Sequence, residues 1–448
     1  MSIDIEGQVL RPERIATLRA EAAHDRHLRA MRGAVGRLGI TKVALDQERL
    51  NQVVHSFSEE LPSPGVTDQM KSGRCWMFAG VNLLRRSAAH ELNAKEFELS
   101  QNYLTFWEKL EKANCFLDDV LTTLDEEKDS RLLGQLFASP AGDGGEWELF
   151  ANLVLKYGVV PTAAMPETHH ANESQLMVTI LNAKLREDGL GLRRAHRAGA
   201  TRGDLLARRD RMLDEIYRML SVFLGLPPET FDLEYRDKDD AFHREAGLSP
   251  HAFLERHVDF DPDAYVSLVN VPTADKPFGV AYLVDHLPVV RGGTPRPYLN
   301  VDAEVMRQAA LRQLEAGEGV YFGCDVAQMM DIEQGILADG LYDLRAVLGV
   351  PVRESKADRL DYLGEIAGGH QMVLSGVHRV DGRPVRWKVE NSWGDKHGEK
   401  GYFAMTDGWF EEYVYQVVVR KAYLDPGLLA ALDRPPVHLP PWDPMRGL

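Results

Sequence analysis

The sequence predicts an α+β protein in which a helical part and a strand-rich part lie on opposite sides of a cleft. Three observations favour this class. Apolar residues recur at helical spacing over much of the chain up to residue 225. Short runs rich in β-branched and aromatic residues dominate the chain after Gly369. A stretch of mixed character separates these two regions, so we expect an inserted segment between them.

Helical patterns come first along the chain. Residues 11–38 mix charged side chains with Leu and Ala at helical spacing, and a hydrophobic helix is predicted to begin near Cys75. The helix predicted at 146–157 ends before Gly158, a residue type favoured just past the end of a helix. Further helices are predicted at 99–113, 172–225 and 302–316.

Strand patterns follow in the second half. The runs at 231–235 and 241–244, with a charged turn at 237–240 between them, predict a hairpin. The segment 265–300 contains further short strand-like runs. Later strands are predicted at 319–322, 372–377, 385–389, 401–405 and 414–419. The proline-rich tail at 435–448 is predicted to be extended.

Length and charge limit the class of protein. At 448 residues the chain is long for one compact domain, so two structural units or one domain with a large insertion are expected. The net charge of −16 argues against nucleic acid as a partner, because phosphate binding needs a basic face. The arginine-rich stretch at 202–211 is interpreted as a solvated helix face.

The expected compartment is the cytoplasm. No apolar run approaches the roughly 20 residues that cross a bilayer, and the N-terminal residues lack the apolar core of a signal peptide. Cys75, Cys115 and Cys324 are too few and too scattered for a disulfide framework. We therefore expect a cytoplasmic protein with no membrane contact.

Cys75 is the first candidate for chemistry. It follows a glycine and begins a hydrophobic helix, where unpaired backbone N–H groups and the helix dipole favour a thiolate. Gln69 lies six positions upstream, so its amide and a backbone N–H could form an oxyanion hole. Without its neighbours, a free cysteine is more often a buried core residue.

His370 and Asn391 are the second and third candidates. His370 stands where a glycine pair gives way to a strand, and Asn391 follows in the run Glu-Asn-Ser-Trp-Gly394. Asn391 can accept a hydrogen bond from the imidazole, and Trp393 can shield that bond from water. The three residue types together predict a thiolate–imidazolium pair with an orienting third group.

The order of these residues resembles that of the papain superfamily. There a Gln precedes the nucleophile by the same spacing, a Trp follows it, and an Asn-Ser-Trp-Gly motif follows the histidine. Ser72 stands where secreted members have a cysteine, which fits a reducing compartment. The segment Ala-Gly-Asp-Gly-Gly-Glu-Trp147 resembles the family's Gly-Gly segment, which implies that Gly144 and Gly145 bind the substrate backbone.

The spacing indicates a branch of this superfamily. Cys75 and His370 are 295 positions apart (370 − 75), against roughly 130–150 in secreted enzymes. Together with Val389-Glu-Asn-Ser-Trp-Gly and the ending Leu439-Pro-Pro-Trp-Asp-Pro-Met, this resembles the bleomycin hydrolase/aminopeptidase C family. The expected segments are an N-terminal helical segment at 1–65, a papain-like helical part at 66–170, an inserted oligomerisation segment at 171–315, a papain-like β part at 316–430 and a C-terminal arm at 431–448.

The resemblance implies a papain-like fold and a cytosolic cysteine aminopeptidase that acts on peptides and assembles as a homohexamer. It implies that Leu448 places its carboxylate in the cleft to receive the substrate α-ammonium. Two departures change these expectations: Arg446 adds a cation near that ammonium, and Gln371 stands where the family has a small residue. We expect altered aminopeptidase selectivity from the first and a narrower, more polar pocket from the second.

Three alternatives remain open. An endopeptidase is expected if the arm does not block the cleft. A metal hydrolase could be imagined around His169, His170, Glu167 and Glu173, but the sequence lacks a His-Glu-x-x-His motif and cysteine pairs, so no metal or cofactor is expected. A non-catalytic binding scaffold would keep the fold without thiol reactivity at Cys75.

Overall fold

The computed structural model describes residues 9–62, 64–363 and 369–447. The helices are α1 Pro12–His24, α2 Arg26–Leu38, α3 Ile40–Ala44, α4 Gln47–Gln52, α5 Cys75–Glu91, α6 Gln101–Thr122, α7 Arg131–Ala138, α8 Trp147–Tyr157, α9 His169–Asn172, α10 Gln175–Arg197, α11 Arg202–Leu224, α12 Pro250–His257, α13 Ala303–Glu315, α14 Leu344–Leu348, α15 Lys356–Asp358, α16 Asp407–Tyr413 and α17 Pro426–Leu429. Across these ranges we find no helix whose length and apolarity would let it span a membrane.

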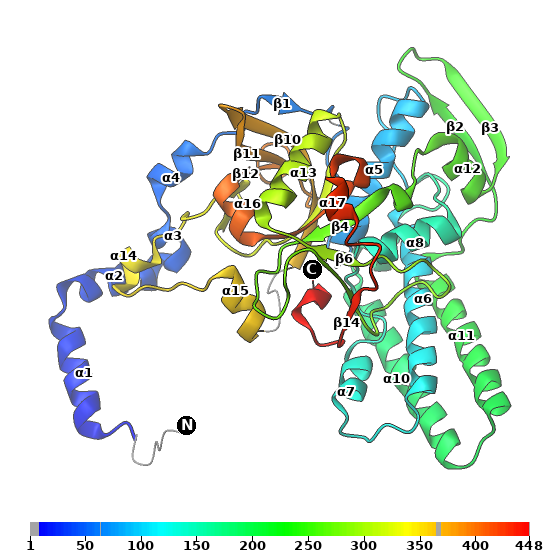
Figure 1. Cartoon of the computed structure of the whole chain (residues 1–448), viewed down its shortest axis with the longest axis horizontal. Helices are drawn as coiled ribbons and strands as arrows, with labels where there is room; N and C mark the ends of the chain where they lie inside the picture. The colour runs from blue at the N-terminus through cyan, green and yellow to red at the C-terminus, as the bar shows by residue number, and fades with distance from the viewer. Residues whose placement is uncertain (1–8, 63, 364–368, 448) are drawn as a thin grey trace.

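One large mixed sheet forms the second part of the molecule (Figure 1). The strands are β1 Glu59–Glu60, β2 Phe231–Arg236, β3 Phe242–Leu248, β4 Tyr265–Val269, β5 Val280–Val284, β6 Tyr298–Asn300, β7 Val320–Asp325, β8 Met330–Asp331, β9 Ile336–Leu337, β10 Gly369–Val380, β11 Arg383–Glu390, β12 Tyr402–Thr406, β13 Val414–Arg420 and β14 Val437–Leu439. The main sheet runs in the order β14-β5-β6-β4-β13-β7-β10-β11-β12-β9-β8, and β1 pairs with β10.

The helical part is built around α5 and α6. Most residues of α5 are buried, and this helix contacts β10 and β7 of the sheet. Figure 1 shows α6, α10 and α11 as three long helices side by side, and each contacts the other two. A hydrophobic core shared by these helices includes Trp76, Phe106 and Phe150. Cys75, the candidate nucleophile, therefore begins a helix that packs between the helical core and the sheet.

The helix ends follow from local sequence. Ser100 caps α6 by accepting a hydrogen bond from the Tyr103 N–H, and Thr201 with Asp204 forms a capping box that begins α11. Gly158 ends α8 with φ 71°, a left-handed backbone region that glycine adopts at little cost. The cap predicted at Gly158 is therefore confirmed.

The predicted hairpin is confirmed as β2 and β3. Its strands pair antiparallel from Phe231 opposite Leu248 to Arg236 opposite Phe242. The Asp237 carboxylate accepts from the N–H groups of Asp239 and Ala241, which fixes the charged turn. The hairpin forms a separate two-stranded sheet.

Other predicted elements differ in extent. The helix predicted at 99–113 continues to Thr122 as α6, because Phe116, Leu117 and Val120 extend its buried face. The tail predicted to be extended also contains a short strand, β14, and a 3-10 turn over Pro444–Gly447. Strands β4, β5 and β6 hydrogen-bond into the main sheet, so the sheet crosses the boundary predicted near residue 315. The division into five segments stays a prediction.

Candidate active site

Cys75 occupies the first position of α5. The preceding residue, Arg74, is buried and donates two hydrogen bonds to the Glu167 carboxylate, at 2.8 and 3.2 Å. Burial raises the pKa of the Cys75 thiol to about 11, although the backbone N–H groups of Gln371, Trp76 and Cys75 itself favour the thiolate. The helix terminus therefore offers the donors expected at a nucleophile, while burial keeps the resting sulfur protonated.

His370 lies on β10, and Asn391 directly follows β11, which pairs antiparallel with β10. The imidazole Nε2 is 2.8 Å from Asn391 Oδ1, which also accepts a hydrogen bond from the Ser392 N–H. The Trp393 ring lies 4.8 Å from the imidazole, centre to centre. Since the amide oxygen only accepts hydrogen bonds, the proton of the neutral imidazole resides on Nε2 and the lone pair on Nδ1.

Burial lowers the pKa of His370 to about 4, against the opposing effect of the hydrogen bond to Asn391. The thiol of Cys75 donates to the side-chain oxygen of Gln371 at 3.1 Å. The structure thus brings His370 and Asn391 into the predicted contact, and it joins Cys75 to the residue that follows the histidine. Burial thus favours the neutral forms of both the thiol and the imidazole.

Gln69 is buried behind the nucleophile loop. Its side-chain nitrogen donates to the Ser72 carbonyl at 2.6 Å, and its side-chain oxygen accepts from the Ser392 hydroxyl at 2.7 Å. The backbone N–H of Gln69 also donates to the Ser392 carbonyl, at 2.8 Å. These bonds fix the amide plane and use one of the two hydrogens on its nitrogen.

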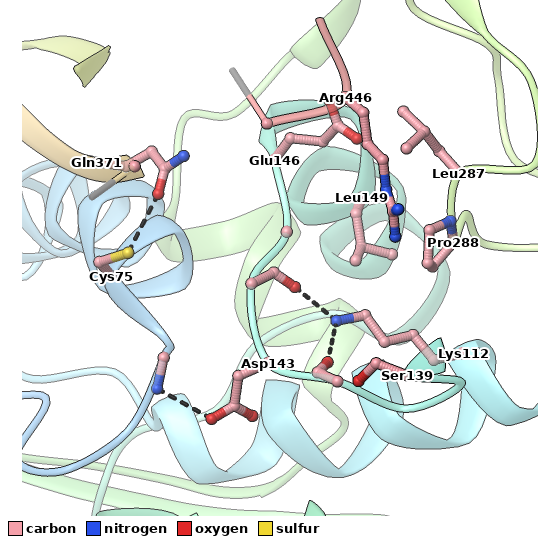
Figure 2. A pocket seen from close by; sticks show the side chains of 16 residues that line it. Cys75, Lys112, Ser139, Asp143, Glu146, Leu149, Leu287, Pro288, Gln371 and Arg446 are labelled. Atoms are coloured by element: carbon pink, nitrogen blue, oxygen red, sulfur yellow. Dashed lines mark hydrogen bonds between the residues drawn. The ribbon is translucent and has the colours of Figure 1, made fainter. Parts of the chain in front are cut away.

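A cavity of about 430 Å³ opens beside Cys75 (Figure 2). Its wall includes Gly144 and Gly145, and Lys112 supports that wall by donating to the Gly144 carbonyl at 2.5 Å. A side chain at position 145 would meet the Trp76 ring at 2.5 Å, so only glycine fits there. The cavity is lined by Gly73, Cys75, Lys112, Ser139, Gly142, Asp143, Gly144, Gly145, Glu146, Leu149, Leu287, Pro288, Gly369, Gln371, Arg446 and Gly447.

A model of the Peptidase C1-like family matches residues 9–446. The chain belongs to this family. It is similar to aminopeptidase C of Listeria monocytogenes, with 45% identity over 392 residues and 88% of each chain covered. It is also similar to aminopeptidase C of Lactococcus lactis, with 41% identity over 427 residues that cover 95% of this chain and 96% of the relative. Among solved structures, PepW from Lactobacillus rhamnosis has a TM-score of 0.95, 41% identity and 98% coverage of both chains.

The family confirms the papain-like fold that the motifs predicted. The C-terminal arm enters the cavity. Arg446 and Gly447 line the cavity, and Met445 is fully buried. β14 pairs with β5, Asp443 lies 3.1 Å from the Lys276 ammonium, and the Arg131 guanidinium stacks over the Trp442 ring at 4.5 Å. Leu448, predicted to bind the substrate ammonium, lies outside the described residues.

The sequence analysis missed Asp143. Its carboxylate accepts from the Gly73 N–H at 3.0 Å, from the Ser174 hydroxyl at 2.5 Å and from the Lys109 ammonium at 2.7 Å. Burial raises its pKa, but the neighbouring Lys109 charge and these hydrogen bonds outweigh burial and hold the pKa of Asp143 below its ordinary range. Asp143 thereby connects the loop before Cys75 to the Gly-Gly segment. In the sequence, its position next to Gly144 is the one signal for that role.

Two of the residues considered as metal ligands, Glu167 and Glu173, form ion pairs instead. Glu167 pairs with Arg74, and Glu173 lies 3.4 Å from the Lys71 ammonium. Over the part of the chain that the structure describes, no group of three His, Cys, Asp or Glu side chains is arranged to hold a metal ion.

Proposed function

We propose that this chain is a papain-like cysteine aminopeptidase in which Cys75 is the nucleophile, His370 the base and Asn391 the residue that orients the base. One observation carries the proposal: the thiol at the start of α5 and Gln371, the residue that follows the Asn391-bound His370, line a cavity that the C-terminal arm enters. The 40–45% identity to aminopeptidases C supports the same activity.

The reaction begins with proton transfer from the Cys75 thiol to His370 Nδ1. The thiolate attacks the carbonyl carbon of the first peptide residue, and the carbonyl oxygen becomes an oxyanion. The second amide hydrogen of Gln69 and the backbone N–H of Cys75 stabilise that oxyanion. Imidazolium then protonates the leaving amine as the carbon–nitrogen bond breaks, which leaves a thioester. His370 next removes a proton from water, and hydroxide attack releases the carboxylic acid and restores the thiol.

The arm explains why only one residue precedes the cleaved bond. Substrate backbone would run beside Gly144 and Gly145 as an added strand, with its N-terminal end directed toward the arm. Arg446 and Gly447 line the cavity. Longer N-terminal extensions would collide with them, which supports an exopeptidase over an endopeptidase. The role predicted for Leu448 stays a prediction.

The test compares a free-amino aminoacyl reporter with its N-acetylated counterpart, each before and after alkylation by iodoacetamide. Thiol-sensitive cleavage of the free-amino reporter alone is expected, and Cys75→Ala should abolish it. Equal cleavage of both reporters would leave a cysteine peptidase but contradict the aminopeptidase assignment. Cleavage that survives both alkylation and Cys75→Ala would contradict the proposed nucleophile.

Assembly and compartment extend the proposal. We propose a cytoplasmic homohexamer that resembles bleomycin hydrolase. Helices α1 and α2 have no buried residue, and exposed Leu18, Leu28 and Leu38 are available to a second copy (Figure 1). Cys75, Cys115 and Cys324 are all free thiols, as a reducing compartment requires. Light scattering on the purified protein measures the assembly directly, and a monomer mass would contradict it.

A further inference from the structure

Glu146 places a carboxylate in the wall of the cavity that contains Cys75. It directly follows Gly145 and precedes the first residue of α8. The residue is 9% exposed, and its side chain lines the cavity. Figure 2 shows Glu146 between the Cys75–Gln371 pair on one side and Arg446 on the other. A carboxyl group at this point faces the path proposed for the substrate.

The contacts of the Glu146 carboxylate within the protein do not account for its position. Its Oε2 atom is buried and has no hydrogen-bond partner among the described residues. Glu146 is the N-cap residue of α8, but its side chain accepts no capping hydrogen bond. A buried polar atom without a partner costs about 1–3 kcal/mol. Such an atom at the wall of a cavity indicates that the partner arrives with a ligand.

The charges around Glu146 define the ligand. Lys112 and Arg446 are the cations that act on it, and Glu148 is the neighbouring anion. The Lys112 ammonium is already committed to the Gly142 and Gly144 carbonyls and to Glu108. Arg446 extends beside Glu146 in Figure 2. A cation brought by the ligand would complete the pairing.

We propose that Glu146 is a specificity-determining residue that binds a cationic group on the peptide substrate, either the α-ammonium or the side-chain charge of a Lys or Arg residue. This inference rests on the proposed aminopeptidase function. The cationic group pairs with the buried carboxylate while Gly145 holds the adjacent backbone. Arg446 occupies the same region in the absence of substrate and competes with the incoming cation.

Burial, followed by the charge of Glu148, raises the pKa of Glu146 well above its ordinary range, against the opposing charges of Arg446 and Lys112. An arriving ammonium stabilises the ionised carboxylate, so binding of the cation releases a proton. The KM of a cationic substrate is therefore expected to fall as the pH rises, and Glu146→Gln should flatten that dependence.

Three reporters separate the two sources of positive charge. A norleucyl reporter carries only the α-ammonium, a hexanoyl reporter carries no charge, and a lysyl reporter carries both the α-ammonium and a side-chain ammonium. Glu146→Gln is expected to lower one kcat/KM ratio about tenfold, mainly through KM. A fall in the norleucyl-to-hexanoyl ratio identifies the α-ammonium as the bound group, and a fall in the lysyl-to-norleucyl ratio identifies the side chain.

Matched variants control for the loss of a buried carboxylate. Glu148 lies two residues further along, and its pKa is also raised, to about 7, by burial, but it does not line the cavity. Glu148→Gln removes this neighbouring anion but no lining side chain, so it should lower neither ratio. Glu146→Asp keeps the charge and should retain the preference even if the glutamine variant folds poorly. Arg446→Gln should raise the affected ratio about threefold because it removes the competing cation.

The inference is overturned if Glu146→Gln leaves both ratios within twofold of the parent values. It is equally overturned if Glu148→Gln lowers them as much. The Cys75→Ala variant separates this failure from failure of the proposed function. Loss of all hydrolysis in Cys75→Ala with unchanged ratios in Glu146→Gln would preserve the peptidase and remove only the role of Glu146.

Discussion

The side-chain oxygen of Gln371 accepts a hydrogen bond from the thiol of Cys75 at 3.1 Å. An acceptor at this distance stabilises the protonated sulfur, whereas the backbone N–H of the same residue stabilises the thiolate. Gln371 therefore acts on the nucleophile itself, in addition to lining the cavity. In the proposed mechanism, the thiol gives up this hydrogen bond when it transfers its proton to His370.

Gln371→Ala is expected to lower the pKa of Cys75 by less than one unit. A neutral hydrogen bond contributes about 1 kcal/mol, which corresponds to a roughly fivefold larger thiolate fraction at pH 7. The midpoint of the pH profile for iodoacetamide alkylation measures this shift, independently of any gain in access. Gln371→Glu is the matched control and should move the midpoint upward, since a carboxylate opposes the thiolate. A higher midpoint in the alanine variant would contradict this role.

Asn391→Ala is expected to reduce kcat about 10–100-fold. The substitution leaves the Nε2–H of His370 without its buried acceptor, at a cost of about 1–3 kcal/mol, and frees the ring to rotate. The hydrogen bond to Asn391 raises the pKa of His370, so its loss lowers that pKa. The acid limb of the pH–rate profile should therefore move to lower pH. Asn152→Ala is the matched control, because that buried amide pairs with Thr294 in a loop and should affect stability but not kcat.

Sequence motifs were sufficient to select the candidate nucleophile, base and orienting residue. Cys75, His370 and Asn391 stand in motifs whose order alone implies their meeting, and the contact between His370 and Asn391 follows from the antiparallel pairing of β10 with β11. The bond from Cys75 to Gln371 could not be predicted, because it depends on a rotamer set by the cavity. Asp143 and Glu146 escaped notice because a carboxylate beside a glycine pair usually marks a solvated turn.

Fold predictions were most accurate where local signals dominate. The start of α5 and the end of α8 follow from a hydrophobic run and from Gly158. The strand β14 was missed because it has three residues in a proline-rich tail, and its partner β5 lies 155 positions earlier (437 − 282). Only tertiary pairing makes such a segment a strand, since its own propensity favours an extended coil.

Asp143→Ala is expected to cost about 3–5 kcal/mol of unfolding free energy, because it removes one of the two carboxylates, Asp143 and Glu108, that pair with the buried Lys109 ammonium. Ser174→Ala removes one hydrogen bond to the same carboxylate and should cost only about 1 kcal/mol. The folded-state pKa of Asp143 is lowered from 3.8. Its contribution is therefore complete above about pH 5 and is lost as the pH falls below 3.8. Urea titrations of the variant and the parent at pH 7 and pH 3 measure this; a difference that grows in acid would contradict it.

Glu390→Gln is expected to cost about 3 kcal/mol and to lower kcat. Both Glu390 and Arg85 have fully buried side chains, and the guanidinium lies 2.8 Å from the carboxylate. Removing the charge leaves a buried cation short of its partner. The pair also joins α5, which begins at Cys75, to the end of β11 next to Asn391, so its loss should loosen the spacing between nucleophile and base.

The Lys71–Glu173 pair provides the contrast. Its atoms are 3.4 Å apart with side chains 81% and 50% exposed, so Lys71→Ala should change stability by about 0–1 kcal/mol. Urea unfolding at low and high salt separates the two cases, because salt screens the exposed pair and leaves the buried pair almost unaffected. Equal losses of unfolding free energy in Glu390→Gln and Lys71→Ala would contradict this prediction. Burial of the Arg85–Glu390 pair would then not determine how strongly α5 is held against the sheet.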